Sequence, residues 1–165
     1  LLGGSVSCVE ETAGAKLVVD GEYDLVETVL PYQPLFIKPN KDELEVMFNT
    51  TVSSDQDVVK YGKEILKKGA QSVIISLGGD GAVYVDEQQS IKAVNPQGKV
   101  INTVGSGDST VAGMVAGLES GLSIQDAFKQ AVASGTPTAL EQDIATSAPK
   151  EQIKSQDPVS VLDGE

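Results

Sequence analysis

Residues 102–113 read NTVGSGDSTVAG, which combines a glycine-framed turn, one carboxylate and the expected start of a helix. A turn made of Gly105, Ser106 and Gly107 leaves backbone N–H groups free to point the same way. A helix that begins near Asp108 adds its own unpaired N–H groups and its positive dipole end, so an anion is stabilised there. A carboxylate beside such a cradle can accept a hydroxyl proton or face a metal-bound phosphate. The stretch therefore indicates phosphoryl transfer.

The simpler interpretation of this stretch is a helix N-cap, in which Asp108 or Ser109 only accepts hydrogen bonds from the first helical turn. The helix that follows is rich in small residues, including Gly113 and Gly117. Glycines inside a helix reduce its stability, so these two indicate that close packing or a bound ligand requires glycine at their positions.

Three other motifs compete for the same residues. A Rossmann fingerprint needs glycine at the position of Thr110, and a P-loop needs lysine at the position of Asp108, so the sequence excludes both. A hydrolase with Ser109 as its nucleophile needs a general base, usually histidine, and the chain contains no histidine. A serine–lysine pair with Lys38 as the base stays open, although nothing in the spacing requires it.

Residues 102–115 resemble the C-terminal signature of the ribokinase-like (PfkB-type) carbohydrate kinases. Two more segments follow the family's order: KPNKDE at 38–43 is similar to its Asn-x-x-Glu element, and SLGGDGA at 76–82 is similar to its nucleotide-binding turn. Within the family, the KPN triplet and the run VSVLDGE at 159–165 most resemble the branch of 1-phosphofructokinases and tagatose-6-phosphate kinases. Of the two, 1-phosphofructokinase is favoured.

The resemblance implies an α/β fold, a three-layer α/β/α sandwich of ribokinase-like type with a mainly parallel central sheet. It implies ATP and Mg²⁺ as cofactors and a small sugar phosphate as partner. The implied reaction is ATP-dependent phosphorylation of a ketohexose phosphate, with fructose 1-phosphate converted to fructose 1,6-bisphosphate. A tagatose-6-phosphate kinase is one alternative, and a nucleotide-binding fragment that is inactive on its own is another.

The resemblance also implies a role for individual residues. Asp108 matches the catalytic base that takes the proton from the acceptor hydroxyl. The turn Gly105, Ser106 and Gly107 matches the anion hole for the transferring phosphoryl group. Such chemistry depends on positioning and electrostatics and needs no covalent intermediate.

Cofactor positions follow from the same resemblance. Asn40 and Glu43 match the element that holds Mg²⁺ through water, as suits a hard cation that keeps part of its hydration shell. The positions implied for ATP are Lys38, Ser76, Leu77, Gly78, Gly79, Asp80, Gly81 and, beside the adenine ring, Ser134.

Each of these positions also has a purely structural interpretation. Asn40 and Glu43 stand three residues apart at an expected helix start, so they can form a cap. Lys38 ends an apolar run and can be a solvated strand end. The glycines at 78–81 can serve a turn between two strands, because turns require positive φ angles regardless of any ligand. Close helix packing explains Ser134 equally well.

The chain length favours one α/β unit. We expect residues 1–165 to form the nucleotide-binding and catalytic portion of a larger sugar kinase, about half of the family's full length, with the N-terminal part and the lid missing. The segment 8–13 is too short for the family's three-turn helix, so we also expect residues to have been omitted near 7–24. The sugar site is expected to lie mostly in the absent half.

The composition excludes several classes of partner. A net charge of −12 and a pI near 4.3 argue against nucleic acid and anionic membranes. All 12 basic residues are lysines. Arginine is better suited to bind a sugar phosphate through two hydrogen bonds, so we expect the residues that bind the acceptor's phosphate to lie outside this sequence. A single cysteine and no apolar run of roughly 20 residues favour a cytoplasmic enzyme. A homodimer is compatible with the resemblance.

Alternating β-branched runs and helical patterns predict a parallel-type α/β sheet. Helices are expected at 55–68, at 107–120 and at 123–136, where Pro137 should end or kink the last one, and a short helix is expected to start at Pro149. The expected strands are 16–20, 35–38, 72–76, 82–86, 90–95 and 159–162.

Overall fold

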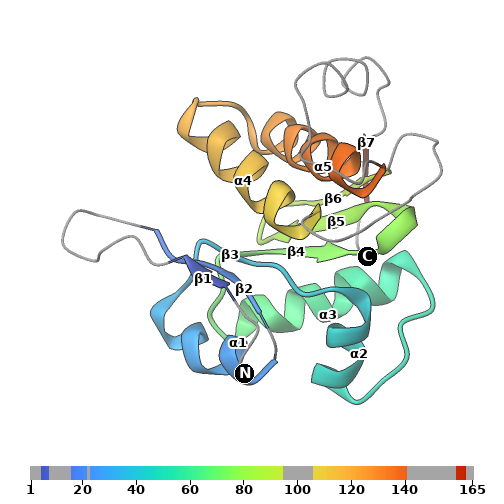
Figure 1. Cartoon of the computed structure of the whole chain (residues 1–165). Helices are drawn as coiled ribbons and strands as arrows, with labels where there is room; N and C mark the ends of the chain where they lie inside the picture. The colour runs from blue at the N-terminus through green and yellow to red at the C-terminus, as the bar shows by residue number, and fades with distance from the viewer. Residues whose placement is uncertain (1–4, 8–15, 22, 95–105, 141–158, 163–165) are drawn as a thin grey trace. The chain divides into compact units, whose positions relative to one another are not determined.

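The computed structural model describes residues 5–7, 16–21, 23–94, 106–140 and 159–162 (Figure 1). Side chains are described at these positions except 5–7, 23–25, 106 and 136–140. The chain divides into two compact units. The first contains residues 1–77, 83–90 and 161–165, and the second contains residues 78–82 and 91–160. Strands are interspersed with helices along the chain, as the predicted α/β class requires.

The strands of the first unit form a mixed sheet. They are β1 (Ser5–Ser7), β2 (Val18–Asp20), β3 (Phe36–Ile37), β4 (Ser72–Ser76) and most of β5 (Ala82–Asp86), which are neighbours in that order. β1 and β2 are antiparallel, whereas β2, β3 and β4 are parallel to one another. Only residues 8–17 separate β1 from β2, which is too few for the crossover that a parallel pair needs. The expectation of a mainly parallel sheet therefore does not hold at this edge.

Three helices pack on one face of this sheet. They are α1 (Tyr23–Val29), α2 (Lys41–Phe48) and α3 (Asp55–Lys67), and a 3-10 turn, η2 (Leu30–Tyr32), follows α1. Their apolar side chains meet those of the strands in one buried cluster, because alternate strand residues point to the same face. The cluster includes Val19, Ile37, Val73 and Ile75 from the strands and Val26, Leu44, Val58 and Ile65 from the helices.

Helix α3 is the element that the sequence predicts best. The hydroxyl of Ser54 accepts a hydrogen bond from the Asp57 N–H at 3.2 Å, and the Asp57 carboxylate accepts one from the Ser54 N–H at 3.1 Å. Hydrogen bonds from Ser53 and Ser54 hold the pKa of Asp57 below its usual value. After the helix, Gly69 has a φ of +131°, and a Cβ there would lie 2.5 Å from the Leu30 carbonyl oxygen, so glycine is required.

The second unit is built around two helices, α4 (Ser106–Glu119) and α5 (Ile124–Leu140), which lie side by side in Figure 1. A Cβ at Gly113 would lie 2.8 Å from the Ala131 Cα, and a Cβ at Gly117 would lie 2.8 Å from the Ala127 Cα. The two helical glycines therefore have a packing reason, since any larger side chain would force the helices apart. The unit also contains η3 (Gly78–Asp80), most of β6 (Ser90–Ala93) and most of β7 (Val159–Val161).

Several sequence expectations need correction. α5 continues through Pro137 to Leu140, so proline neither ends the helix there nor marks its boundary. The fixed φ of proline is compatible with a helix, and its missing N–H removes one backbone hydrogen bond. A helix that is already packed along most of its length can lose one such bond near its end. The short helix α1 was not predicted from the sequence, although Val26, Val29 and Leu30 are spaced for one buried stripe. The helix expected to start at Pro149 lies outside the described residues.

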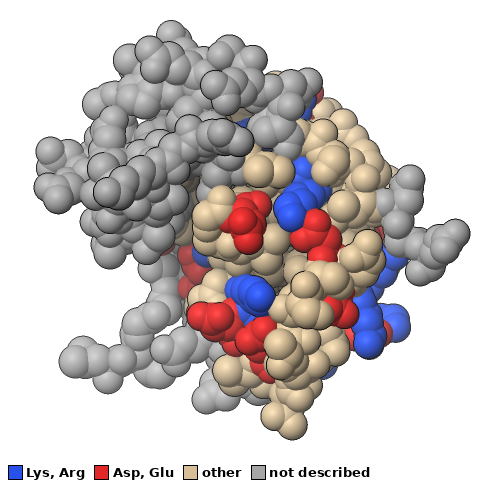
Figure 2. Space-filling view, turned by 90° about the vertical axis from the view of Figure 1, so that its right-hand side faces the viewer, with Lys and Arg blue, Asp and Glu red and all other residues tan. Residues whose placement is uncertain are grey.

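The surface carries charges of both signs. Figure 2 shows acidic and basic side chains intermixed on the face that it draws. One ion pair joins Lys68 of the first unit to Glu27 of α1, with 2.5 Å between Nζ and Oε1. Among the described residues, none of the helices combines the length and the apolar character that a bilayer crossing requires.

Candidate active site

Polar residues of the first unit gather where its parallel strands end. Asp20 is the last residue of β2, Lys38 follows β3 directly, and Ser76 is the last residue of β4. The Lys38 N–H donates to the Val19 carbonyl at 2.9 Å, and the Ser76 N–H donates to the Pro39 carbonyl at 3.0 Å. Ligands of α/β sheets bind beyond the carboxyl ends of the strands, and this edge is formed by three of them.

Lys38 is a buried side chain. Its residue is only 7% exposed, so the alternative of a solvated strand end is wrong. Its ammonium nitrogen lies 3.2 Å from the Oδ2 of Asp20. Sequence reasoning did not identify Asp20 as a site residue. Its pairing with Lys38 depends on the strand register that the structure shows, in which Val19 is paired with Ile37 and the next residues are Asp20 and Lys38.

Asn40 and Glu43 form the N-terminal cap of α2. The side-chain oxygen of Asn40 accepts from the Glu43 N–H, and the Glu43 Oε2 accepts from the Asn40 N–H, each at 2.8 Å. This reciprocal capping box confirms the structural interpretation of the pair. A parallel bridge also joins Asn40 to Ser76, which brings the cap to the carboxyl end of β4.

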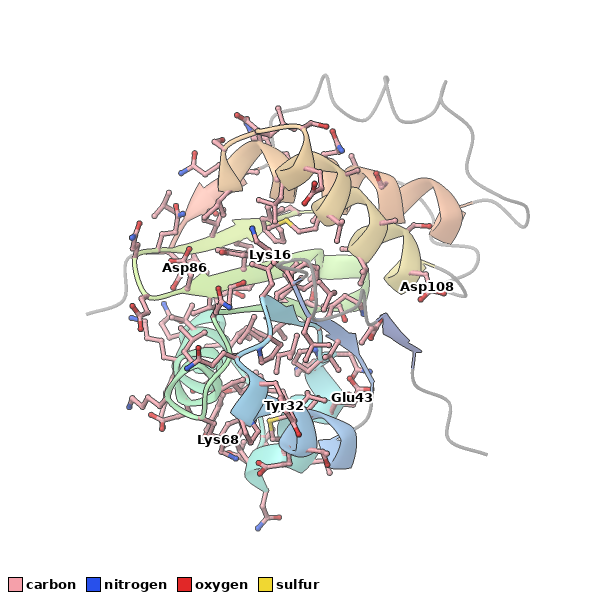
Figure 3. All side chains as sticks on the ribbon, turned by 90° about the vertical axis from the view of Figure 1, so that its left-hand side faces the viewer. Lys16, Tyr32, Glu43, Lys68, Asp86 and Asp108 are labelled. Atoms are coloured by element: carbon pink, nitrogen blue, oxygen red, sulfur yellow. The ribbon has the colours of Figure 1, made fainter. Side chains whose placement is uncertain are left out.

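The same pair has suitable chemistry for Mg²⁺, because both side chains offer oxygen ligands. Glu43 uses one carboxylate oxygen in the cap, which leaves its other oxygen for a metal-bound water. Figure 3 shows Glu43 at the start of α2. The described part of the chain holds no group of three or more Asp, Glu, Cys or His side chains suited to a metal.

Replacing Glu43 with Gln separates the two roles. Glutamine can still accept the hydrogen bond from the Asn40 N–H, so the free energy of unfolding should fall by no more than about 1 kcal/mol, the value of a first-turn charge. If Glu43 also holds a Mg²⁺-bound water, the Mg²⁺ concentration needed for half-maximal ATP binding should rise about tenfold or more. Urea unfolding and ATP titrations at several Mg²⁺ concentrations measure both quantities.

Asp42→Asn is the matched control, because Asp42 is an exposed acid in the same helical turn. It should lower stability by a similar small amount and leave the Mg²⁺ requirement unchanged. An equal shift in both variants would show that only the charge near the helix start matters.

The turn after β4 contains glycines with different requirements. Gly81 has a φ of +92°, and a Cβ there would lie 2.0 Å from the Ala93 carbonyl oxygen. Gly78 has a φ of +60° but open space around it. At Gly79 neither constraint applies, because no positive φ occurs and nothing lies within 4 Å of an added Cβ. Packing therefore explains Gly81, the backbone explains Gly78, and neither explains Gly79.

The other implied nucleotide positions are divided between the two units. Leu77 packs against the buried cluster of the first unit. Asp80 is exposed at the end of η3. Ser134 is 8% exposed in α5, and a Cβ on Gly113 would lie 2.9 Å from its hydroxyl oxygen. Close helix packing thus accounts for the burial of Ser134, and a contact with adenine stays a prediction.

Asp108 is an exposed side chain in the first turn of α4. Figure 3 shows it at the start of that helix. Gly105 lies outside the described residues, while Ser106 is the first residue of α4 and Gly107 the second. The helix is 14 residues long, so its first turn presents a full positive dipole end. The carboxylate is accessible there to a proton donor from solvent or from a bound molecule.

Comparisons with known proteins identify the family of this chain. A model of the pfkB family carbohydrate kinases matches residues 15–151. The chain is 37% identical over 147 residues to the 1-phosphofructokinase of Bacillus subtilis (strain 168), covering 89% of this chain and 48% of that protein. It is 74% identical to a crystal structure from Staphylococcus aureus that is provisionally named a phosphofructokinase, with a TM-score of 0.88 over 92% of this chain and 50% of that one.

A more distant structure supports the fold alone. The ribokinase of Thermotoga maritima is 19% identical, with a TM-score of 0.67 over 79% of this chain and 45% of that one. The curated relatives also include tagatose phosphate kinases. The chain spans about half the length of the curated relatives and solved structures that it matches. It belongs to the pfkB family of carbohydrate kinases, in the branch of the 1-phosphofructokinases and tagatose kinases.

Proposed function

We propose that the protein to which this chain belongs transfers the γ-phosphoryl group of ATP to a ketohexose phosphate, with fructose 1-phosphate as the first choice. The observation that carries the proposal is the exposed Asp108 in the first turn of α4, directly after the glycine segment of the family signature. The similarity to a 1-phosphofructokinase supports the choice of acceptor. ATP and sugar phosphates occur in the cytoplasm, so we place the enzyme there.

In this proposal Asp108 accepts the proton of the acceptor hydroxyl as the new O–P bond forms and the bond between the γ-phosphorus and the bridging oxygen breaks, with ADP as the leaving group. A carboxylate at a helix start is otherwise well solvated, and a bound sugar would replace that water. The N–H groups of Gly105, Ser106 and Gly107 donate to the oxygens of the transferring group. Donors fixed before the reaction need no reorganisation when the charge moves, which makes them effective.

The remaining roles concern the nucleotide. Lys38 is proposed to bind ATP phosphates as a point charge, and the turn Ser76 to Gly81 to bind the nucleotide through backbone groups. The unexplained glycine at 79 supports this, because a backbone without a side chain allows close approach of a phosphate. Mg²⁺, when bound, would offset the phosphate charge, with Asn40 and Glu43 holding its waters.

An assay of ADP release tests the proposal. The acceptors are fructose 1-phosphate, tagatose 6-phosphate, fructose 6-phosphate and ribose, each with ATP and Mg²⁺. We expect the highest kcat/KM with fructose 1-phosphate. A preference for tagatose 6-phosphate would favour the alternative acceptor, which the tagatose-6-phosphate kinase relatives support. No acceptor-dependent ADP release from the complete protein would contradict kinase activity altogether.

The chain by itself provides a second comparison. It contains both the nucleotide turn and Asp108, but it spans only about half of its relatives. If it binds ATP without releasing ADP in the presence of any acceptor, it is a nucleotide-binding fragment that needs the rest of the enzyme. Turnover by the chain alone would show that the sugar site is present within 1–165.

A further inference from the structure

The strand register places Asp20 opposite Lys38. Val18 is paired with Phe36, and Val19 is paired with Ile37, in the parallel strands β2 and β3. The next position in that register is Asp20 beside Lys38, and side chains at paired positions of parallel strands point to the same face. Val19 and Ile37 point into the buried cluster under the helices, so Asp20 and Lys38 belong to the opposite face. Their 3.2 Å ion pair follows from this arrangement.

This ion pair differs from the others in the described structure. The Lys38 side chain is 8% exposed and that of Asp20 is 26% exposed, whereas the pairs Lys67–Glu64 and Lys68–Glu27 are at least 38% exposed on both sides. A buried ammonium is costly unless it is paired. Among the described residues, Asp20 is the one carboxylate within ion-pair distance of Lys38. Asp20 therefore determines where that ammonium group lies.

We propose that Asp20 is a positioning residue, which fixes the Lys38 ammonium at the carboxyl ends of β2 and β3 so that it can bind an ATP phosphate. The inference rests on the proposed function of Lys38. A lysine side chain has four rotatable bonds, and ordering them on binding reduces affinity. Because the ion pair with Asp20 has already ordered the Lys38 side chain, the phosphate meets a charge that is already in position. An ammonium has three N–H donors, so it can contact Asp20 and a phosphate together.

A second effect of Asp20 acts in the opposite direction. Its carboxylate repels the phosphates directly, and this repulsion does not depend on Lys38. Lys38→Met keeps most of the apolar stem and removes the ammonium. In that background only the direct repulsion remains, so the two effects of Asp20 can be separated by a double-mutant cycle.

The experiment measures the dissociation constant of Mg·ATP by calorimetry for this chain and its variants. Asp20→Ala should weaken ATP binding roughly three- to tenfold, the range expected for ordering one long side chain. In the Lys38→Met background the same change should leave affinity equal or tighter. Asp20→Asn keeps an acceptor oxygen and should recover most of the affinity. Adenosine, which lacks phosphate, should bind all variants equally.

Glu64→Gln is the matched control, because it breaks an exposed lysine–carboxylate pair in the same unit and should not change ATP affinity. Thermal unfolding identifies any variant that is unfolded at the assay temperature. If Asp20→Ala binds ATP as tightly as the parent chain, or weakens ATP and adenosine alike, the positioning role is wrong while the kinase proposal stands. If neither this chain nor the complete protein binds ATP, both proposals are overturned.

Discussion

Asp108→Asn should lower kcat of the complete enzyme by about 10²- to 10⁴-fold, the usual contribution of a positioned general base. Asparagine has nearly the same shape as aspartate but cannot accept the proton of the acceptor hydroxyl. It can still accept hydrogen bonds at the start of α4, where Asp108 lies exposed in the first turn. The dissociation constant for ATP should therefore change by less than about threefold, and the far-UV circular dichroism should not change.

The control for this prediction is Asp126→Asn. Asp126 is an exposed acid in the first turn of α5, where its carboxylate accepts a hydrogen bond from the Ser123 hydroxyl at 2.7 Å. Its replacement should cost a little stability and leave kcat unchanged. If Asp108→Asn retains turnover within a few-fold of the parent enzyme, Asp108 is only a helix cap. If both variants lose turnover equally, the loss comes from the helices and not from the chemistry.

Sequence reasoning was most successful where local signals agreed. The strands 72–76 and 82–86 and helix α3 have the predicted positions, and the signature helix begins one residue before the predicted start. In each case the hydrophobic pattern and the boundary residues indicate the same element, as in the serine cap and terminal glycine of α3. Pro137 shows the opposite case, since a helix held by packing against α4 continues through a local breaker.

The candidate site was only partly predictable. The sequence order indicated Asp108, the Asn40–Glu43 pair and the glycine turn, but it could not distinguish a cap from a metal ligand, because the same residues at the same spacing form both. The cap is present in the structure. The burial of Lys38 and its pairing with Asp20 were not predictable locally, since they depend on the register of two strands separated by α1.

The turn at 78–81 allows a prediction with a large effect and an internal control. Gly81→Ala should lower the free energy of unfolding by about 2–5 kcal/mol, from backbone strain and overpacking together. Its φ of +92° is unfavourable for alanine, and the new Cβ would lie 2.0 Å from the Ala93 carbonyl oxygen and 2.9 Å from the Val94 Cα. Both of these are backbone atoms, which cannot move aside as the end of a side chain can. Urea unfolding measures the change.

Gly79→Ala tests the same turn without that clash. Nothing lies within 4 Å of an added Cβ, so stability should stay within about 0.5 kcal/mol of the parent chain. If a phosphate approaches the backbone at this position, the methyl group would occupy that space, and the dissociation constant for ATP should rise about tenfold or more. Unchanged ATP affinity in a stable Gly79→Ala chain would remove the turn from the nucleotide site. In that case the turn would be explained by the positive φ of Gly78 and the close packing around Gly81, and the glycine at 79 would have no assigned role.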